Sequence, residues 1–374
     1  MKIKLIGTAY PYRGGLALYN ERLMEEFHSQ SHDVSIDTFS LQYPSFLFPG
    51  KSQFASWEKP SKFPIRRLIN SVNPINWILQ GIRIKRERPD ILIIKYWLPF
   101  MSPCFSTIAR IAKINKHTKV ICIVDNMIPH EKRFFDNIFT KYFVPSVDGF
   151  IAMSQSVLED ISIFDKVKPR TLSPHPLFDN FGKPLPKKEA LDLLDLKEED
   201  INLLFFGLIR EYKGLDILLE ALTDQRLKDF PIKLLVAGEF YENPEPYYEK
   251  IRVLGLEKRV RVDAKFIPDD EVKKYFCSTD LVVLPYKTAT QSGVTQIGYH
   301  FSKPMLVTNV GGLAEIIPDK RCGYVAEPNP ISIANSILEF CEKRPDFSLE
   351  IEQEKKKYSW LRMTQAIEDL MTKI

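Results

Sequence analysis

Two cationic side chains stand three residues apart in the second half of the chain. Arg210 and Lys213 come after the apolar run INLLFF and Gly207, and Gly214 precedes the apolar stretch LDILLEAL. A strand ending at Gly207, with a helix after Gly214, would hold both cations at the carboxyl end of a sheet. There they can neutralise a diphosphate, which is most useful when that group gains charge as it leaves. A solvated surface turn is the alternative interpretation.

A short segment of small and polar residues follows further along the chain, after the run LVVLPY. A helix that begins near its serine and glycine would present backbone N–H groups to an anion, and hydroxyl groups would add donors. Many helices begin this way. The interpretation as an anion site is strengthened because we expect the segment to lie in the same crevice as the predicted cationic turn. The candidate binding residues here are Gln291, Ser292, Gly293, Val294, Thr295 and Gln296.

The elements that position these groups can be predicted from the apolar runs. KIKLIGTA, DILIIKYW and KVICIVDN are strand-length runs in the first half, and helical stretches separate them. Runs that are apolar on both faces indicate parallel strands covered on both sides. A Pro- and Gly-rich stretch at about residues 174–188 breaks the pattern, which then restarts. The sequence therefore predicts an α/β fold with two doubly wound Rossmann-like domains that face each other across a deep cleft.

The composition is that of a globular protein without a membrane span or signal peptide, so a cytoplasmic location is expected. Five scattered cysteines favour neither a disulfide framework nor a zinc site. Residues 1–185 carry 25 Lys/Arg and 16 Asp/Glu, which indicates either an anionic partner or a solvated face. Region 57–88 mixes aromatic and basic residues on expected helices. It predicts contact with an anionic membrane, with ordinary helices packed on the sheet as the alternative. No nucleic-acid motif accompanies these charges, so nucleic acid is not expected as a partner.

Several ordered segments carry a family resemblance, among them PYRGGLALYNERL, FFGLIREYKG, VAGE, KFIPDDEV, STDLVVLPY, KPMLVTNVGGLAEII and GYVAEPNP. Together they resemble the retaining glycosyltransferases of family 4, which have the GT-B fold. KYSWLRMTQAI resembles the C-terminal helix of that family, which crosses back onto the first domain. The resemblance implies an acceptor domain at 1–178 plus a helix at about 358–374. It also implies a nucleotide-sugar domain at 179–357.

The same resemblance implies the chemistry and the remaining site residues. It implies transfer of a sugar from a nucleoside diphosphate to a glycan or lipid-linked glycan, in cell-surface polysaccharide or glycoconjugate synthesis. No metal or cofactor is expected. Arg210, Lys213, His130 and Asp125 are the catalytic candidates, with Asp125 as the base if the reaction inverts. Besides the helix-start segment, the donor-binding candidates are Gly14, Gly15, Gly207, Gly238, Glu239, Phe266, Ile267 and Glu315.

The chain departs from the family where a pair of glutamates usually contacts the donor sugar and ribose. Thr290 and Gly298 occupy those positions, and Gln291 and Gln296 are the nearby substitutes. Leu208 also stands where the family arginine normally follows the glycine. Two alternatives stay open: a nucleotide-sugar epimerase on the same fold, and a non-catalytic nucleotide-binding or scaffold protein. The sequence also does not distinguish a retaining from an inverting mechanism.

Overall fold

The computed structural model describes residues 1–43, 53–55, 61–128 and 134–374, and it divides into two compact units. Unit 1 comprises Met1–His175 and Ser359–Ile374, and unit 2 comprises Pro176–Tyr358. The division lies inside the Pro- and Gly-rich stretch, just before the boundary predicted at residue 178.

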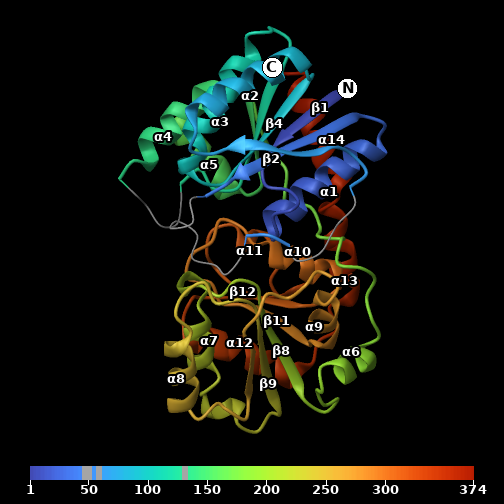
Figure 1. The fold of residues 1–374 in the computed structure, drawn as a ribbon. Helices are drawn as coiled ribbons and strands as arrows, with labels where there is room; N and C mark the ends of the chain where they lie inside the picture. Colours follow the sequence, from blue (N-terminus) through green and yellow to red (C-terminus); the bar gives the residue numbers. More distant parts are fainter. Residues whose placement is uncertain (44–52, 56–60, 129–133) are drawn as a thin grey trace. The chain divides into compact units, whose positions relative to one another are not determined.

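Unit 1 is built on a seven-stranded sheet in the order β3-β2-β1-β4-β5-β6-β7, with every adjacent pair parallel. Helices α2 to α5 lie on one side of this sheet and α1 and α14 on the other (Figure 1). The elements are β1 (Lys2–Ile6), α1 (Gly15–Ser29), β2 (Asp33–Leu41), β3 (Ile65–Asn70), α2 (Pro74–Glu87), β4 (Ile91–Tyr96), α3 (Ser102–Lys113), β5 (Lys119–Val124), α4 (Asp136–Phe143), β6 (Gly149–Ala152), α5 (Gln155–Phe164), β7 (Arg170–Leu172) and α14 (Trp360–Met371).

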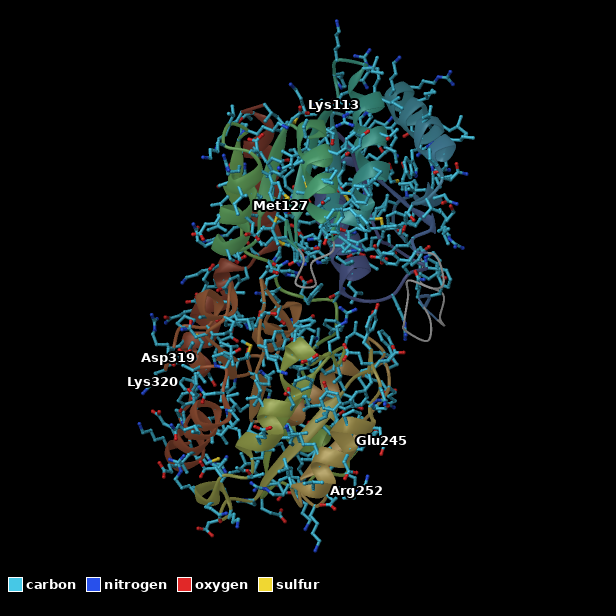
Figure 2. All side chains as sticks on the ribbon, turned by 90° about the vertical axis from the view of Figure 1, so that its left-hand side faces the viewer. Lys113, Met127, Glu245, Arg252, Asp319 and Lys320 are labelled. Carbon is cyan, nitrogen blue, oxygen red and sulfur yellow. The ribbon has the colours of Figure 1, made fainter. Side chains whose placement is uncertain are left out.

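The central strands of unit 1 are apolar because both of their faces are covered. Every residue of β4 is buried, and so are all residues of β5 after its first. Met127, labelled in Figure 2, continues this core beyond the carboxyl end of β5. The sheet therefore delivers the residues after β5, including Asp125, to the edge where parallel strands end.

One expected element of region 57–88 is wrong. Residues 65–70 (IRRLIN) form the edge strand β3, which pairs with β2, while the helix predicted downstream is present as α2. The two arginines of β3 are exposed and its Ile69 is fully buried. An edge strand has one neighbour and tolerates charged side chains, so its hydrophobic signal is weak.

Unit 2 has a six-stranded sheet in the order β10-β9-β8-β11-β12-β13, again with parallel pairing throughout. Helices α7, α8 and α12 pack into one layer, and α6 packs with α9 (Figure 1). The elements are α6 (Lys187–Leu193), β8 (Ile201–Phe206), the 3-10 turn η4 (Glu211–Lys213), α7 (Leu215–Ala221), β9 (Ile232–Ala237), α8 (Glu245–Val253), β10 (Val260–Asp263), α9 (Val272–Ser278), β11 (Leu281–Leu284), α10 (Gly293–His300), β12 (Met305–Thr308), α11 (Leu313–Ile316), β13 (Gly323–Ala326), α12 (Pro330–Lys343) and α13 (Ser348–Glu354).

Helix α14 belongs to unit 1 although it follows unit 2 along the chain. Trp360 is buried with its ring centroid 5.2 Å from that of Tyr19, and Met363 is fully buried. Leu370 packs so closely on β6 that a Cβ added to Gly149 would lie 3.2 Å from its side chain. This returning helix completes the apolar cover on one side of the unit 1 sheet.

Candidate active site

The turn after β8 brings Lys213 back over the end of its own strand. Gly207 has φ +100° and donates its N–H to the Ala237 carbonyl at 2.9 Å. A Cβ added to Gly207 would lie 3.3 Å from Lys213 Nζ and 3.6 Å from the Val294 side chain. The glycine therefore leaves room for the ammonium group beside the first turn of α10.

Lys213 and Arg210 form a cationic pair inside unit 2. Burial lowers the pKa of Lys213, the Tyr212 side chain opposes that shift, and the Arg210 guanidinium adds to it. Among the described residues, Lys213 Nζ has no carboxylate within ion-pair distance, and its ammonium lies 5.4 Å from the Tyr286 ring centroid. Arg210 Cζ lies 3.8 Å from the Tyr241 ring centroid, and its buried Nε lacks an acceptor in the same part of the chain. An anion placed here would satisfy both groups.

A close glycine contact joins this turn to the segment before α10. Gly214 has φ +69°, and a Cβ added there would lie 1.9 Å from the Pro285 carbonyl oxygen. Lys287 donates its backbone N–H to the Tyr212 carbonyl at 2.7 Å. The cationic turn and the loop that leads to α10 are therefore neighbours at one edge of the sheet, because β8 pairs with β11.

Helix α10 begins where the sequence predicted, with Ser292 as its N-cap. Ser292 Oγ accepts the Val294 N–H at 3.2 Å and lies 3.2 Å from the Tyr286 hydroxyl. Thr295 is fully buried, and its hydroxyl donates to the Ser292 carbonyl at 2.6 Å. The hydroxyl hydrogen of Thr295 is thus engaged inside the helix, and the expected role of this residue in donor binding stays a prediction. The amides of Ser292 and Gly293 are the better anion donors.

The loop before α10 packs on the turn before α11. Gly311 has φ +47°, and a Cβ added there would lie 1.6 Å from the Ala289 carbonyl oxygen and 3.6 Å from Thr290 Cα. Gln291 is half-buried in this loop, and Glu315 is exposed on α11. The candidates that were predicted from separate segments are therefore brought to one region.

Packing explains why a glutamate is absent from one of the two positions of the expected pair. A Cβ added to Gly298 would lie 2.5 Å from Met305 Sδ, so a larger side chain does not fit there. Gln296, the nearby substitute, is fully buried on α10. Neither end of its side-chain amide has a hydrogen-bond partner within the described ranges.

The ends of β8 and β9 meet through glycine. A Cβ on Gly238 would lie 1.8 Å from the Gly207 carbonyl oxygen, and Ile209 donates its N–H to the carbonyl of the buried Glu239 at 2.9 Å. Phe266 and Ile267 follow β10, which pairs with β9, and Ile267 is buried. These four predicted residues consequently occupy the same carboxyl edge as Gly207.

In unit 1 the structure adds a residue that the sequence interpretation missed. Asp125 follows β5, and its Oδ1 lies 2.8 Å from Nζ of the buried Lys95. Lys95 Nζ also lies 3.5 Å from the Tyr19 ring centroid. Burial lowers the pKa of Lys95, and the Asp125 carboxylate opposes that shift. A single lysine inside the apolar run DILIIKYW was the signal that could have found it.

The other unit 1 candidates differ in what the structure says of them. Gly14 has φ +98° at the start of α1 with open space where a side chain would lie, and Gly15 is the first residue of that helix. His130 lies outside the described residues. The described residues hold no group of three His, Cys, Asp or Glu side chains arranged to bind a metal.

Comparison with known proteins points to one class of enzyme. Residues 200–343, which include all of the unit 2 candidates, match the family model described as glycosyl transferases group 1. An uncharacterized glycosyltransferase of Methanocaldococcus jannaschii is 25% identical over 370 residues, which cover 96% of this chain and 95% of that protein. The lipopolysaccharide 1,2-N-acetylglucosaminetransferase of Salmonella typhimurium is 27% identical over 199 residues, with 50% and 52% covered.

A solved structure extends the likeness to the whole chain. Anabaena HepE in complex with UDP superposes with a TM-score of 0.75 at 15% identity, and all of both chains is covered. Together with the two parallel sheets, this likeness confirms the predicted GT-B fold.

Proposed function

We propose that this chain, a glycosyltransferase with the GT-B fold, transfers a sugar from a nucleoside diphosphate donor to a glycan or lipid-linked glycan acceptor. The observation that carries the proposal is the buried Lys213 beside the first turn of α10, with the half-buried Arg210 close enough to affect its pKa. The UDP bound by HepE and the lipopolysaccharide acceptor named for the Salmonella relative support the two substrate classes. We place the activity in cell-surface polysaccharide or glycoconjugate synthesis.

The cationic pair acts on the leaving group. Transfer breaks the bond between the anomeric carbon of the sugar and a diphosphate oxygen, and negative charge grows on that oxygen. Lys213 and Arg210 are held in place before the donor arrives, so little reorganisation is needed when the charge develops. Lys213 lies beside the first turn of α10, and the N–H groups at that helix start add donors, which supports a diphosphate rather than a single phosphate as the bound group.

Unit 1 supplies the acceptor side in this proposal. Asp125 accepts a hydrogen bond from the acceptor hydroxyl, and Lys95 fixes the orientation of the carboxylate. Gly14 and Gly15 let the backbone approach the substrate. We assign the retaining outcome from the resemblance to family 4. The anomeric configuration of the product, measured by proton NMR, tests that assignment.

Recognition of the donor sugar is proposed to rest on uncharged groups. Gly298 leaves no room for a glutamate next to Met305, and Thr290 lacks a carboxylate. Gln291, in the loop packed on Gly311, is the residue that we assign to the sugar hydroxyls. Gln291→Ala should then change the preference among nucleotide sugars that share a base, while leaving the affinity for the bare nucleoside diphosphate unchanged.

The proposal is tested first by a donor screen. Nucleotide sugars and their diphosphates should raise the melting temperature of the protein, and the effective donor should then glycosylate an acceptor. Product formed from the donor alone by epimerisation would favour the epimerase, an alternative that the named relatives do not support. Absence of stabilisation by uridine and guanosine diphosphates alike would favour the scaffold protein.

Metal dependence is a separate expectation. Because Arg210 and Lys213 supply positive charge at the diphosphate, we expect turnover to persist in excess EDTA within about twofold. Loss of turnover in EDTA, restored by added Mg²⁺ or Mn²⁺, would show that a bridging cation is needed.

The described residues include no helix that is both long and apolar enough to cross a membrane. Membrane contact through region 57–88 is therefore a proposal about surface docking. In that region Phe63 is buried and Trp77 packs against the core. Arg83 forms ion pairs with Asp37 and Glu87. Trp57 lies outside the described residues, and the aromatic side chains of Phe63 and Trp77 are less available than the sequence suggested.

A further inference from the structure

One aromatic ring in unit 2 lies directly against the guanidinium of Arg210. Arg210 Cζ lies 3.8 Å from the ring centroid of Tyr241, and both side chains are half-buried. A guanidinium at this distance is attracted by the face of the ring and can stack on it. The Tyr241 ring therefore holds the guanidinium without neutralising its positive charge.

The pairing of the strands places Tyr241 beside Arg210. The parallel pairing of β8 with β9 continues past both strand ends, where Ile209 forms a bridge with Phe240. Ile209 donates its N–H to the Glu239 carbonyl at 2.9 Å, and Tyr241 donates its N–H to the Ile209 carbonyl at 3.0 Å. Arg210 and Tyr241 each come one residue after this bridge, so their side chains project to the same side. Backbone hydrogen bonds thus set the position of the ring.

Two packed helices support the segments that carry the pair. Helix α7 follows the cationic turn, α8 follows Tyr241, and the two helices pack on each other (Figure 1). Phe240 packs on α8, with its ring centroid 5.5 Å from that of Tyr247 and 6.0 Å from that of Tyr248. The Tyr241 ring is therefore attached to ordered elements, whereas the long arginine side chain has many rotamers to lose.

We propose that Tyr241 is a positioning residue that orients Arg210 toward the donor diphosphate. The inference rests on the proposed function and deepens it, because it gives a residue outside the cationic turn a role in the same site. The ring restricts the guanidinium before the donor arrives, so less side-chain freedom is lost on binding. Arg210 Nε has no hydrogen-bond acceptor within the described ranges, and a phosphate oxygen would supply one. The oriented guanidinium then acts together with Lys213, whose pKa it lowers.

A double-mutant cycle on the full chain tests this role by calorimetric titration. The probe is uridine or guanosine diphosphate, whichever stabilises the protein more. Tyr241→Leu should weaken its affinity about three- to tenfold in the otherwise wild-type protein, because the guanidinium loses its support. In the Arg210→Met background the same substitution should cost less than about twofold, because no guanidinium is left to orient.

Two further variants separate the ring from its surroundings. Tyr241→Phe retains the ring and should keep the affinity for the diphosphate within about twofold. Tyr248→Leu is the matched control, since it removes another half-buried tyrosine ring that packs on Phe240. This control should bind the diphosphate as the wild-type protein does.

Several results would overturn the positioning role. An equal loss from Tyr241→Leu in both backgrounds would show that the ring acts without Arg210. An equal loss in Tyr248→Leu would show a general loosening of these segments, and an equal loss in Tyr241→Phe would assign the effect to the hydroxyl group. Unchanged or tighter binding by Tyr241→Leu would show that the ring does not direct Arg210 to the diphosphate. Failure of the proposed function looks different, because Arg210→Met by itself would then leave diphosphate binding unchanged.

Discussion

At the scale of single residues, the candidate donor site keeps a buried lysine without a carboxylate partner among the described residues. Such an arrangement costs stability in the empty protein and becomes favourable when an anion binds. Lys303 provides a contrast in the same unit. It is half-buried and its pKa is also lowered by burial, but it donates to the carbonyls of Cys277 and Thr279 at 3.1 and 2.9 Å.

Lys213→Met should therefore stabilise the empty protein while weakening donor binding. We expect the free energy of unfolding to rise by about 1 kcal/mol, because an uncompensated buried charge is removed. Affinity for the effective nucleoside diphosphate should fall at least tenfold, the loss of one charge-assisted contact. Chemical denaturation and calorimetric titration measure the two effects. Lys303→Met is the control, and it should lose stability and keep nucleotide affinity.

The stabilising effect of Lys213→Met should also depend on pH. The folded state lowers the pKa of Lys213 below its ordinary 10.5, so the unfolded chain binds the proton more tightly. The wild-type protein regains stability as pH rises through the lowered pKa. The excess free energy of unfolding of the methionine variant over the wild type should consequently decrease as pH rises from that pKa to 10.5. A constant advantage from pH 7 to 10 would contradict the assigned cause.

The sequence predicted the cationic pair because charge directly after a strand and glycine is a local pattern. It could not predict that the Thr295 hydroxyl bonds to the Ser292 carbonyl, since that depends on the cap geometry. Lys95 was missed for a related reason. Its partner Asp125 lies on the neighbouring strand end, and only the sheet register brings the two together.

At the scale of elements, glycines set how closely the loops of unit 2 approach one another. The sequence contains Gly214 and Gly311, but it does not tell that they approach the carbonyl groups of Pro285 and Ala289. Those contacts follow from strand order, which no local pattern encodes. The edge strand β3 illustrates the same limit, because a short Arg-rich segment becomes a strand only through pairing with β2.

Gly311→Ala should disturb the site through its loop. The new Cβ would meet the Ala289 carbonyl, and the left-handed backbone adds strain, so we expect a loss of about 2–3 kcal/mol in stability. The loop before α10 must then shift, and affinity for the nucleoside diphosphate should fall severalfold. Gly255→Ala is the matched control: its φ is +66° with open space around the new Cβ. It should lose about 1 kcal/mol and bind normally. Equal binding by both variants would show that the loop tolerates the shift.

At the scale of the whole molecule, one chain folds into two compact units. Leu370→Ala removes a buried side chain of α14 that packs on Gly149 in unit 1, and should destabilise that unit by about 2–5 kcal/mol. Nucleoside diphosphate should stabilise unit 2 instead. Differential scanning calorimetry should resolve the two effects as opposite shifts of separate transitions. A single transition that moves as one would show that the units unfold together.

The return of α14 has a consequence for the order in which the protein is made. Residues 1–175 leave the ribosome first, yet the helix that covers one side of their sheet is encoded after residues 176–358. At roughly 5–20 residues per second, synthesis of the intervening unit takes on the order of 10–40 s. Throughout that interval the apolar surface around Tyr19 and Gly149 lacks its final cover. The first unit therefore reaches its final packing only after the second unit has been translated.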